Sequence, residues 1–329
     1  MAHARRAQRA CSGRLTVHTR IDPLADARGR LAGLDDANAP VTAPVIVACS
    51  GGPDSTALLA LAADRGLDPI AVHVDHGLRD GSADEADAVA AFAAALGTAF
   101  AARRVEVGQG GNLEARARAA RYAILDTAAD DHGASAVLVG HTADDQAETM
   151  VLALLRGSAA AGLAGMPVRR ERIVRPLLHL RRAETEAICV GLGLEPVRDP
   201  SNADVSLRRA WVRHEVLPLL ALGAGRDLVP VLTRQAEVLR TESEYLDSLA
   251  RAAWPPAPAP DAAPAAPLAR LPLALARRAV RCWLGAPPPS FDEVERVLAV
   301  ARGGARATEL AGGRNVRRSG GQLFLTEPQ

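Results

Sequence analysis

The chain has 329 residues, 48% of them hydrophobic, which is enough for two domains with sizeable cores. Its formal net charge of +1 excludes a global basic field, so a nucleic-acid partner would have to meet local arginine clusters. The four cysteines include no Cys-x-x-Cys pair, which argues against a zinc or iron–sulfur site and against a disulfide framework.

Residues 1–42 show no sustained hydrophobic periodicity, which predicts a poorly ordered leader with room for a short helix. From residue 45 onward, strand-like apolar runs at 45–49, 69–76, 99–107 and 135–139 alternate with stretches at helical spacing. This alternation predicts an α/β fold with a doubly wound parallel sheet. Ligands of such sheets bind beyond the C-terminal ends of the strands, so we expect the site in the loops after Cys49, Val74 and Val139.

Beyond residue 157 the pattern changes to helices and arginine-rich loops, with helices expected at 210–220, 228–253, 271–284 and 291–301. Short strand-like runs with glycine turns follow at 305–326. We therefore expect a catalytic domain over 43–222 and a smaller C-terminal α+β domain over 223–329. A Pro-rich linker is expected near 254–272.

The first strand leads into a run that predicts a phosphate site. A glycine turn between a strand and a helix presents backbone N–H groups to an anion, and the glycines let the backbone approach a ligand closely. The chain contains no Lys, so this is not a Walker A loop; a carboxylate stands inside the run and would tolerate phosphates only with Mg²⁺ between them. The run consists of Ser50, Gly51, Gly52, Pro53, Asp54 and Ser55.

Two later helices carry charged residues at helical spacing. Glu114, Arg118 and Arg121 share one face, which fits either intrahelical ion pairs on a solvated helix or contact with phosphates and a polynucleotide. His141, Asp145 and Glu148 follow the fourth expected strand and lie roughly on one side. These acidic groups either complement the helix dipole or bind a cationic substrate or Mg²⁺–ATP, and their spacing argues against zinc.

Arginine clusters occur at 169–182, at 198–214 and at 314–318. Each is compatible with a solvated surface, and together they are compatible with a track for a polyanion. The middle cluster includes Arg208, Arg209 and Arg213.

Taken in order, these motifs resemble the tRNA(Ile)-lysidine synthetase family, a branch of the PP-loop ATPases. The resemblance rests on the run at 50–55, His-Val-Asp-His-Gly-Leu-Arg at 73–79, the segment 114–122, and His141 to Thr149. It continues through Arg-Pro-Leu-Leu at 175–178, Asp-Pro-Ser-Asn at 199–202 and Arg-His-Glu-Val-Leu-Pro at 213–218. It implies a fold like that of the adenine nucleotide alpha hydrolases. It also implies a ligase that adenylates the wobble cytidine of an isoleucine tRNA with a CAU anticodon. Free lysine then displaces AMP, giving lysidine, so that codon reading changes from AUG to AUA.

The resemblance also implies roles for individual residues. ATP would be held by residues 50–55, with Mg²⁺ on Asp54. The catalytic residues would be Asp54, Arg118, His141, Asp145 and Glu148, and the tRNA-binding residues Glu114, Arg121, Arg208, Arg209 and Arg213. The C-terminal domain would bind tRNA. The chain departs from the family pattern at Thr142, where a second His is frequent, and at 207–210, where Tyr and Asn are common.

Other readings stay open at this point. They are a PP-loop tRNA thiolase, another AMP-forming ligase or amidotransferase, and a non-enzymatic nucleotide-binding or RNA-binding module. The apolar runs are too short to cross a bilayer and no signal peptide is evident, so we expect a cytoplasmic protein without membrane contact. A monomer and a homodimer are both compatible with the sequence.

Overall fold

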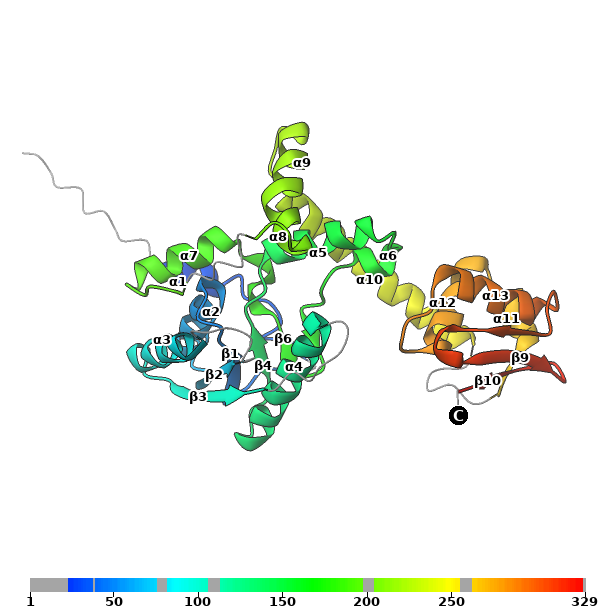
Figure 1. The fold of residues 1–329 in the computed structure, drawn as a ribbon, viewed down its shortest axis with the longest axis horizontal. Helices are drawn as coiled ribbons and strands as arrows, with labels where there is room; N and C mark the ends of the chain where they lie inside the picture. Colours follow the sequence, from blue (N-terminus) through cyan, green and yellow to red (C-terminus); the bar gives the residue numbers. More distant parts are fainter. Residues whose placement is uncertain are drawn as a thin grey trace, which may run out of the picture. The chain divides into compact units, whose positions relative to one another are not determined.

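The computed structural model describes residues 23–37, 39–75, 82–105, 113–197, 204–254 and 262–327 (Figure 1). The chain divides into two compact units. Unit 1 comprises Met1–Thr142 and Val168–Asp199, and unit 2 comprises Ala143–Pro167 and Pro200–Gln329. We describe each unit by itself.

Unit 1 is built on a six-stranded sheet in the order β3-β2-β1-β4-β6-β5. Its first four strands pair in parallel, β6 joins β4 in parallel, and only β5 is antiparallel to its neighbour. The predicted parallel α/β sheet is thus confirmed. The strands are β1 (Val45–Ala48), β2 (Pro69–Asp75), β3 (Ala99–Arg104), β4 (Val137–Val139), β5 (Arg169–Arg170) and β6 (Ile173–Val174).

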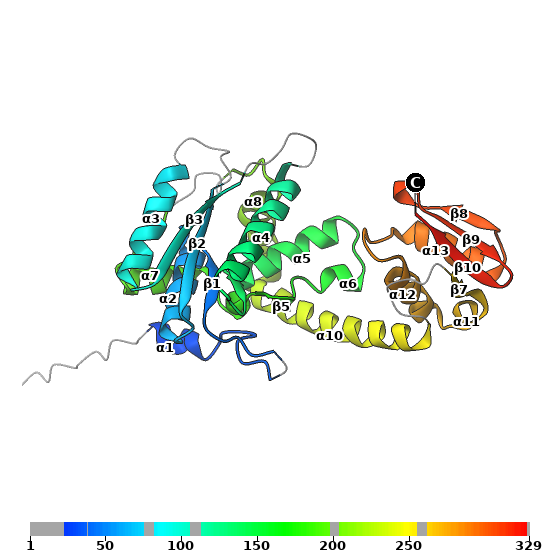
Figure 2. The same cartoon turned by 90° about the horizontal axis from the view of Figure 1, so that it is seen from below.

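Helices cover both faces of this sheet, and the central strand shows why (Figure 2). Successive side chains of a strand point to opposite faces. Val45 and Val47 belong to one buried cluster, and Ile46 belongs to the other. The first cluster packs under α2 (Pro53–Asp64), α3 (Ser82–Ala95) and α7 (Arg182–Gly191), and the second under α4 (Leu113–Asp131). Both faces of β1 are therefore apolar and buried, as a doubly wound sheet requires.

Part of unit 1 differs from the expectation for residues 1–42. From residue 23 onward the chain forms helix α1 (Pro23–Arg28), and Arg28 pairs with Asp64 of α2. Leu34 and Val41 are buried in the core, and the Val41 N–H donates to the Leu34 carbonyl at 3.0 Å. These apolar contacts come from a loop, which has no periodicity for sequence analysis to detect. Residues 1–22 lie outside the described residues.

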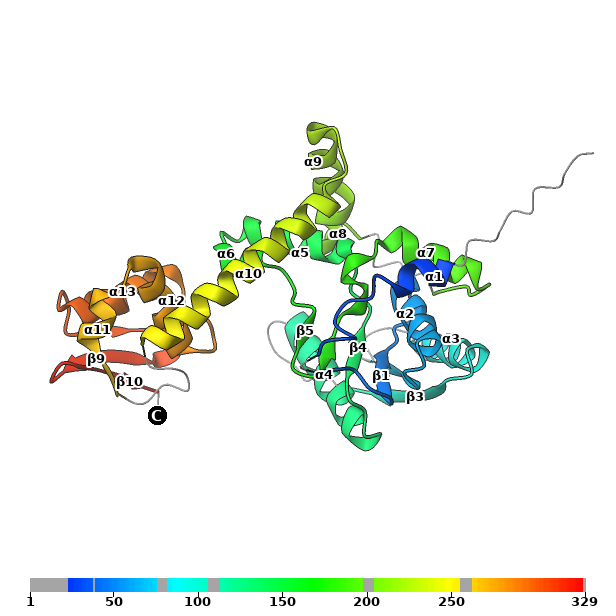
Figure 3. The same cartoon turned by 180° about the vertical axis from the view of Figure 1, so that it is seen from behind.

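Unit 2 begins with helices gathered along one long helix, α10 (Val229–Ala253) (Figure 3). Ala143 and Ala147 of α5 (Ala143–Leu155) pack against Val229, and Arg240 donates to the Ala164 and Met166 carbonyls that follow α6 (Ala160–Leu163). The expected helix at 210–220 is present as α8 (Arg208–Trp211), the π-helical turn η3 (Val212–Val216) and α9 (Leu217–Ala224).

The end of unit 2 is an antiparallel sheet in the order β7-β10-β9-β8, covered by three helices. Its elements are β7 (Ala262–Pro264), α11 (Ala265–Arg270), α12 (Leu273–Leu284), α13 (Phe291–Arg302), β8 (Ala307–Glu309), β9 (Asn315–Ser319) and β10 (Gln322–Thr326). β7 and α11 lie where a Pro-rich linker was expected. They are ordered because Ala263 pairs with Leu323 and because Ala265 and Leu268 are fully buried.

Among the described helices, none is by itself long and apolar enough to cross a membrane. The segments Arg208–Ala224 and Val229–Ala253 meet that test of length and composition only as a pair, bent by 96°.

Candidate functional site

The run at 50–55 forms a tight turn between β1 and α2. Gly51 has a φ of +83°, in the left-handed region that side chains rarely adopt. A Cβ there would also lie 3.1 Å from Val197 Cγ2, and the Gly51 carbonyl accepts a hydrogen bond from the Val197 N–H at 2.9 Å. The turn therefore requires glycine at this position and is held from outside by residue 197.

The two serines of the run close the turn on itself. Ser55 Oγ accepts from the Ser50 N–H at 3.2 Å, donates to the Gly52 carbonyl at 3.0 Å and lies 3.4 Å from Ser50 Oγ. Gly52 is the N-cap of α2, and no side chain caps that end of the helix. A helix end of this kind presents first-turn N–H groups and the positive end of the dipole to an anion. The loop has the chemistry of a phosphate site.

The Asp54 carboxylate is held by α7, a helix that the sequence analysis did not predict. Thr185 donates its hydroxyl proton to Asp54 Oδ1, and Arg182 Nε lies 3.5 Å from Asp54 Oδ2. Gly140, just after β4, approaches the same residue so closely that a Cβ would lie 3.0 Å from the Asp54 backbone carbon. Asp54 is thus fixed by two elements. The signal for α7 is the helical spacing of its buried residues Thr185, Ile188 and Cys189, which the surrounding arginine-rich sequence obscured.

The end of β2 contributes a structural histidine. His73 is buried, and its Nδ1 lies 3.0 Å from the Cys49 carbonyl oxygen, which ties β2 to the start of the loop. Asp75 ends the strand, with Oδ2 at 4.0 Å from Arg104 Nε. Residues 76–81, which hold the rest of this motif, lie outside the described residues.

Arginines gather around one aromatic ring on α4. Arg118 Nη2 donates to the Tyr122 hydroxyl at 3.2 Å, and the guanidinium carbons of Arg118 and Arg121 lie 5.1 and 5.7 Å from its ring centroid. Arg175 also contacts Tyr122, and burial lowers the pKa values of the Arg121 and Arg175 guanidinium groups. The face shared by Arg118 and Arg121 is therefore an electropositive aromatic cluster, which suits a phosphate or a planar base. The side chain of Glu114 lies outside the described part of the chain.

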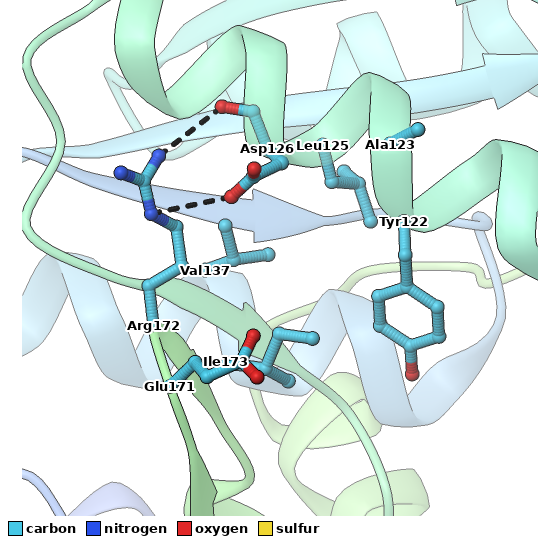
Figure 4. Close-up of a pocket in the computed structure, with 8 residues that line it drawn as sticks. All are labelled: Tyr122, Ala123, Leu125, Asp126, Val137, Glu171, Arg172 and Ile173. Atoms are coloured by element: carbon cyan, nitrogen blue, oxygen red, sulfur yellow. Dashed lines mark hydrogen bonds and ion pairs between the residues drawn. The ribbon is translucent and has the colours of Figure 1, made fainter. Parts of the chain in front are cut away.

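A pocket of about 220 Å³ lies beside α4, and Tyr122 is one of the residues that line it (Figure 4). Its polar lining is occupied by ion pairs, because Arg172 lies 3.2 Å from Asp126 and 2.7 Å from Asp130. Val137, which also lines it, begins β4, whereas the phosphate loop follows the end of the neighbouring parallel strand. The pocket therefore lies away from the phosphate loop, and it shares only Tyr122 with the arginine cluster of α4.

In unit 2, α5 carries a buried pair of carboxylates. Glu148 is fully buried and Asp145 is 7% exposed. Arg209 of α8 and Arg213 of η3 face both of them. Arg209 Nε lies 2.8 Å from Glu148 Oε2, and Arg213 Nε lies 2.7 Å from Glu148 Oε1. Arg209 and Arg213, which sequence analysis assigned to tRNA binding, thus form ion pairs with the two carboxylates. Arg208, assigned to the same role, is exposed.

His141 and Thr142 precede α5 and lie in unit 1, where the His141 N–H donates to the Val139 carbonyl at 3.0 Å. Among the described residues, no three His, Cys, Asp or Glu side chains form a group that could hold a metal ion.

Two family models match the chain. A model described as the PP-loop domain matches residues 32–220, and one described as the TilS substrate binding domain matches residues 264–324. The structure is similar in fold to the U34-tRNA thiolase NcsA from Methanococcus maripaludis. The TM-score is 0.54, with 19% sequence identity over 67% of this chain and 78% of that one.

Curated relatives named tRNA(Ile)-lysidine synthase match between 72% and 88% of the chain. The protein from Salinispora tropica is 43% identical, over 88% of this chain and 92% of its own length. The one from Thermobifida fusca is 43% identical over 87% and 93%, and that from Mycolicibacterium paratuberculosis is 48% identical over 72% and 73%. The chain therefore belongs to the tRNA(Ile)-lysidine synthase family of PP-loop enzymes.

Proposed function

We propose that this protein joins free lysine to the wobble cytidine of the CAU anticodon of an isoleucine tRNA at the expense of ATP. The product, lysidine, would pair with adenosine and change codon reading from AUG to AUA. The observation that carries the proposal is the phosphate loop at 50–55, closed by Ser50 and Ser55. The chain that holds it matches 92% of the length of the Salinispora tropica relative, which bears the name of this activity.

In the first step, ATP binds with its phosphates at the N-terminus of α2. The loop N–H groups and the Ser50 hydroxyl donate to phosphate oxygens, and the helix dipole favours their charge. The cytidine carbonyl oxygen attacks the α-phosphorus, pyrophosphate leaves, and the base is adenylated. Mg²⁺ would neutralise the phosphate charge, and the oxygen donors of Asp54 fit its ligand preference. Thr185 and Arg182 orient that carboxylate.

In the second step, an amine of lysine attacks the activated ring carbon and AMP leaves with the former carbonyl oxygen. Lysine arrives as an ammonium ion and must lose a proton before its nitrogen can attack. We assign the recognition of this cation to Asp145 and Glu148, the buried carboxylates of unit 2. His141 would serve as a base or as a residue that positions the ligand.

The remaining assignments concern RNA. Arg118 and Arg121, which lie against the Tyr122 ring, suit the nucleotide or the target base, and the spacing of Glu114 puts it on the same face of α4. Exposed Arg208 suits a tRNA phosphate. Residues 262–327 hold ten arginines against five acidic residues, which supports a tRNA-binding role for the C-terminal domain.

We place the reaction in the cytoplasm, where ATP, lysine and tRNA occur together. The sequence is compatible with a monomer and with a homodimer.

The thiolase alternative is not favoured by the cysteines. Burial raises the pKa of Cys49 to about 12 and that of Cys189 to about 11, so both thiols stay protonated at neutral pH. Sulfur transfer needs an accessible thiolate or a cluster, and the described cysteines provide neither arrangement.

The loop assignment is tested by pyrophosphate release in the presence of lysine and isoleucine tRNA. Asp54→Ala should abolish release, and Asp87→Ala, which removes an exposed carboxylate on α3, should leave it unchanged. Normal turnover of Asp54→Ala would overturn the role given to Asp54.

A further inference from the structure

The carboxylates of α5 already have cationic partners in the structure. Asp145 and Glu148 carry two negative charges, and the guanidinium groups of Arg209 and Arg213 carry two positive charges. The charges of these four side chains balance, and both carboxylates are buried. A further cation that simply joined the cluster would leave one uncompensated positive charge in a desolvated place, which is unfavourable. Binding of an ammonium group there therefore calls for the departure of a resident cation.

The two arginines are held differently. Arg213 makes two contacts with one carboxylate, Nε to Glu148 Oε1 at 2.7 Å and Nη2 to Glu148 Oε2 at 3.2 Å, in the bidentate manner that fixes a side chain. It lies on the π-helical turn at 212–216, and its side chain is 23% exposed. This arginine is anchored to the more buried carboxylate.

Arg209 instead bridges the two carboxylates. Its Nε lies 2.8 Å from Glu148 Oε2 and its Nη2 lies 3.0 Å from Asp145 Oδ1, with one contact to each. Its side chain is 37% exposed and projects from α8, a helix of only four residues. Arg213 Nη2 is 3.8 Å from Asp145, so Arg209 is the nearer cation to that carboxylate. Of the two, Arg209 is the one placed to leave.

We propose that Arg209 is a resident counter-ion that an ammonium group of the substrate replaces at Asp145, and that Arg213 is a positioning residue that holds the Glu148 carboxylate in its orientation. The exchange keeps the cluster neutral, because one cation enters as another leaves. It also returns the Arg209 guanidinium to solvent beside exposed Arg208. This inference rests on the proposed function for the identity of the ammonium compound, which is lysine.

Calorimetric titration of L-lysine into the full chain, with a non-hydrolysable ATP analogue and without tRNA, tests the proposal. Arg209→Gln removes the competitor, so the Kd for lysine should fall about fivefold or more. Arg213→Gln should raise it, Arg213→Lys should restore part of the affinity, and the Kd for the ATP analogue, titrated separately, should stay constant in both. Arg226→Gln, which loses an exposed arginine of the same unit, should match the wild type.

The outcomes separate the two proposals. If the wild type binds lysine and Arg209→Gln binds it equally or more weakly, the exchange is wrong and the proposed function stands. If the wild type binds no lysine under any condition and transfers none to tRNA, both fail. Arg209→Lys keeps the positive charge and guards against a folding defect in the glutamine variant. It should bind lysine within about twofold of the wild type, and tighter binding like that of Arg209→Gln would also overturn the exchange.

Discussion

The buried carboxylate of Glu148 offers a sharp test of the energetics of unit 2. It accepts three hydrogen bonds from two guanidinium groups, at 2.8, 2.7 and 3.2 Å. Glu148→Gln keeps the shape of the side chain and removes its charge. The new amide group must then point a donor at an arginine donor, and the cluster is left with a net positive charge that is shielded from water.

The expected cost follows from removing one partner of a buried ion pair, which is about 3–5 kcal/mol. A loss of about 3 kcal/mol is a large part of the 5–15 kcal/mol that stabilises a typical domain. For a unit of this size, about 1 kcal/mol corresponds to a Tm change of about 2–4 °C. Glu148→Gln should therefore lower the Tm of the unit 2 transition by about 6–20 °C.

The assay is thermal unfolding followed by circular dichroism, with Glu242→Gln on an exposed position of α10 as the matched control. The double variant Glu148→Gln with Arg209→Gln should recover part of the loss, because the excess positive charge is also removed. A Glu148→Gln protein that melts within about 1 °C of the control would refute the view that this cluster stabilises the unit.

Three further predictions follow from other contacts. Thr185→Val removes the hydroxyl that donates to Asp54 and should lower pyrophosphate release about tenfold. Thr127→Val, at an exposed position of α4, should leave pyrophosphate release unchanged. Gly140→Ala places a methyl group 3.0 Å from the Asp54 backbone carbon, so the KM for ATP should rise in steady-state kinetics; an unchanged KM would show that the loop tolerates the shift. Hydrogen bonds from the Ala311 N–H and from Ser290 lower the pKa of Glu293 to about 2. The stability that they contribute is present above the ordinary pKa of 4.5 and is lost as the pH falls from 4.5 to about 2. Acid unfolding monitored by circular dichroism should show this loss, and Glu293→Ala should abolish it at a cost of about 1–3 kcal/mol at pH 7.

The sheet of unit 1 could be predicted because its signals are local. The runs of β-branched residues that form β1 and β2 predict strands, and the glycine turn at 51 predicts the end of the first strand. Each of these signals lies within a few residues. Parallel pairing then follows from the alternation with helices.

The contacts made by the candidate site could not be predicted in the same way. Arg209 reaches Glu148 across 61 positions of sequence, and Thr185 reaches Asp54 across 131. In a chain rich in arginine, an arginine that pairs with a buried carboxylate looks the same as one on a solvated surface. Leu34 and Val41 are buried from a loop, where burial leaves no periodic pattern.

The most direct test of the central claim is transfer of radiolabelled lysine to isoleucine tRNA with the CAU anticodon, measured with AMP and pyrophosphate release. We predict that incorporation requires ATP, lysine and this tRNA together, with one AMP formed for each lysine attached. Pyrophosphate release without tRNA, or incorporation of sulfur in place of lysine, would contradict the assignment.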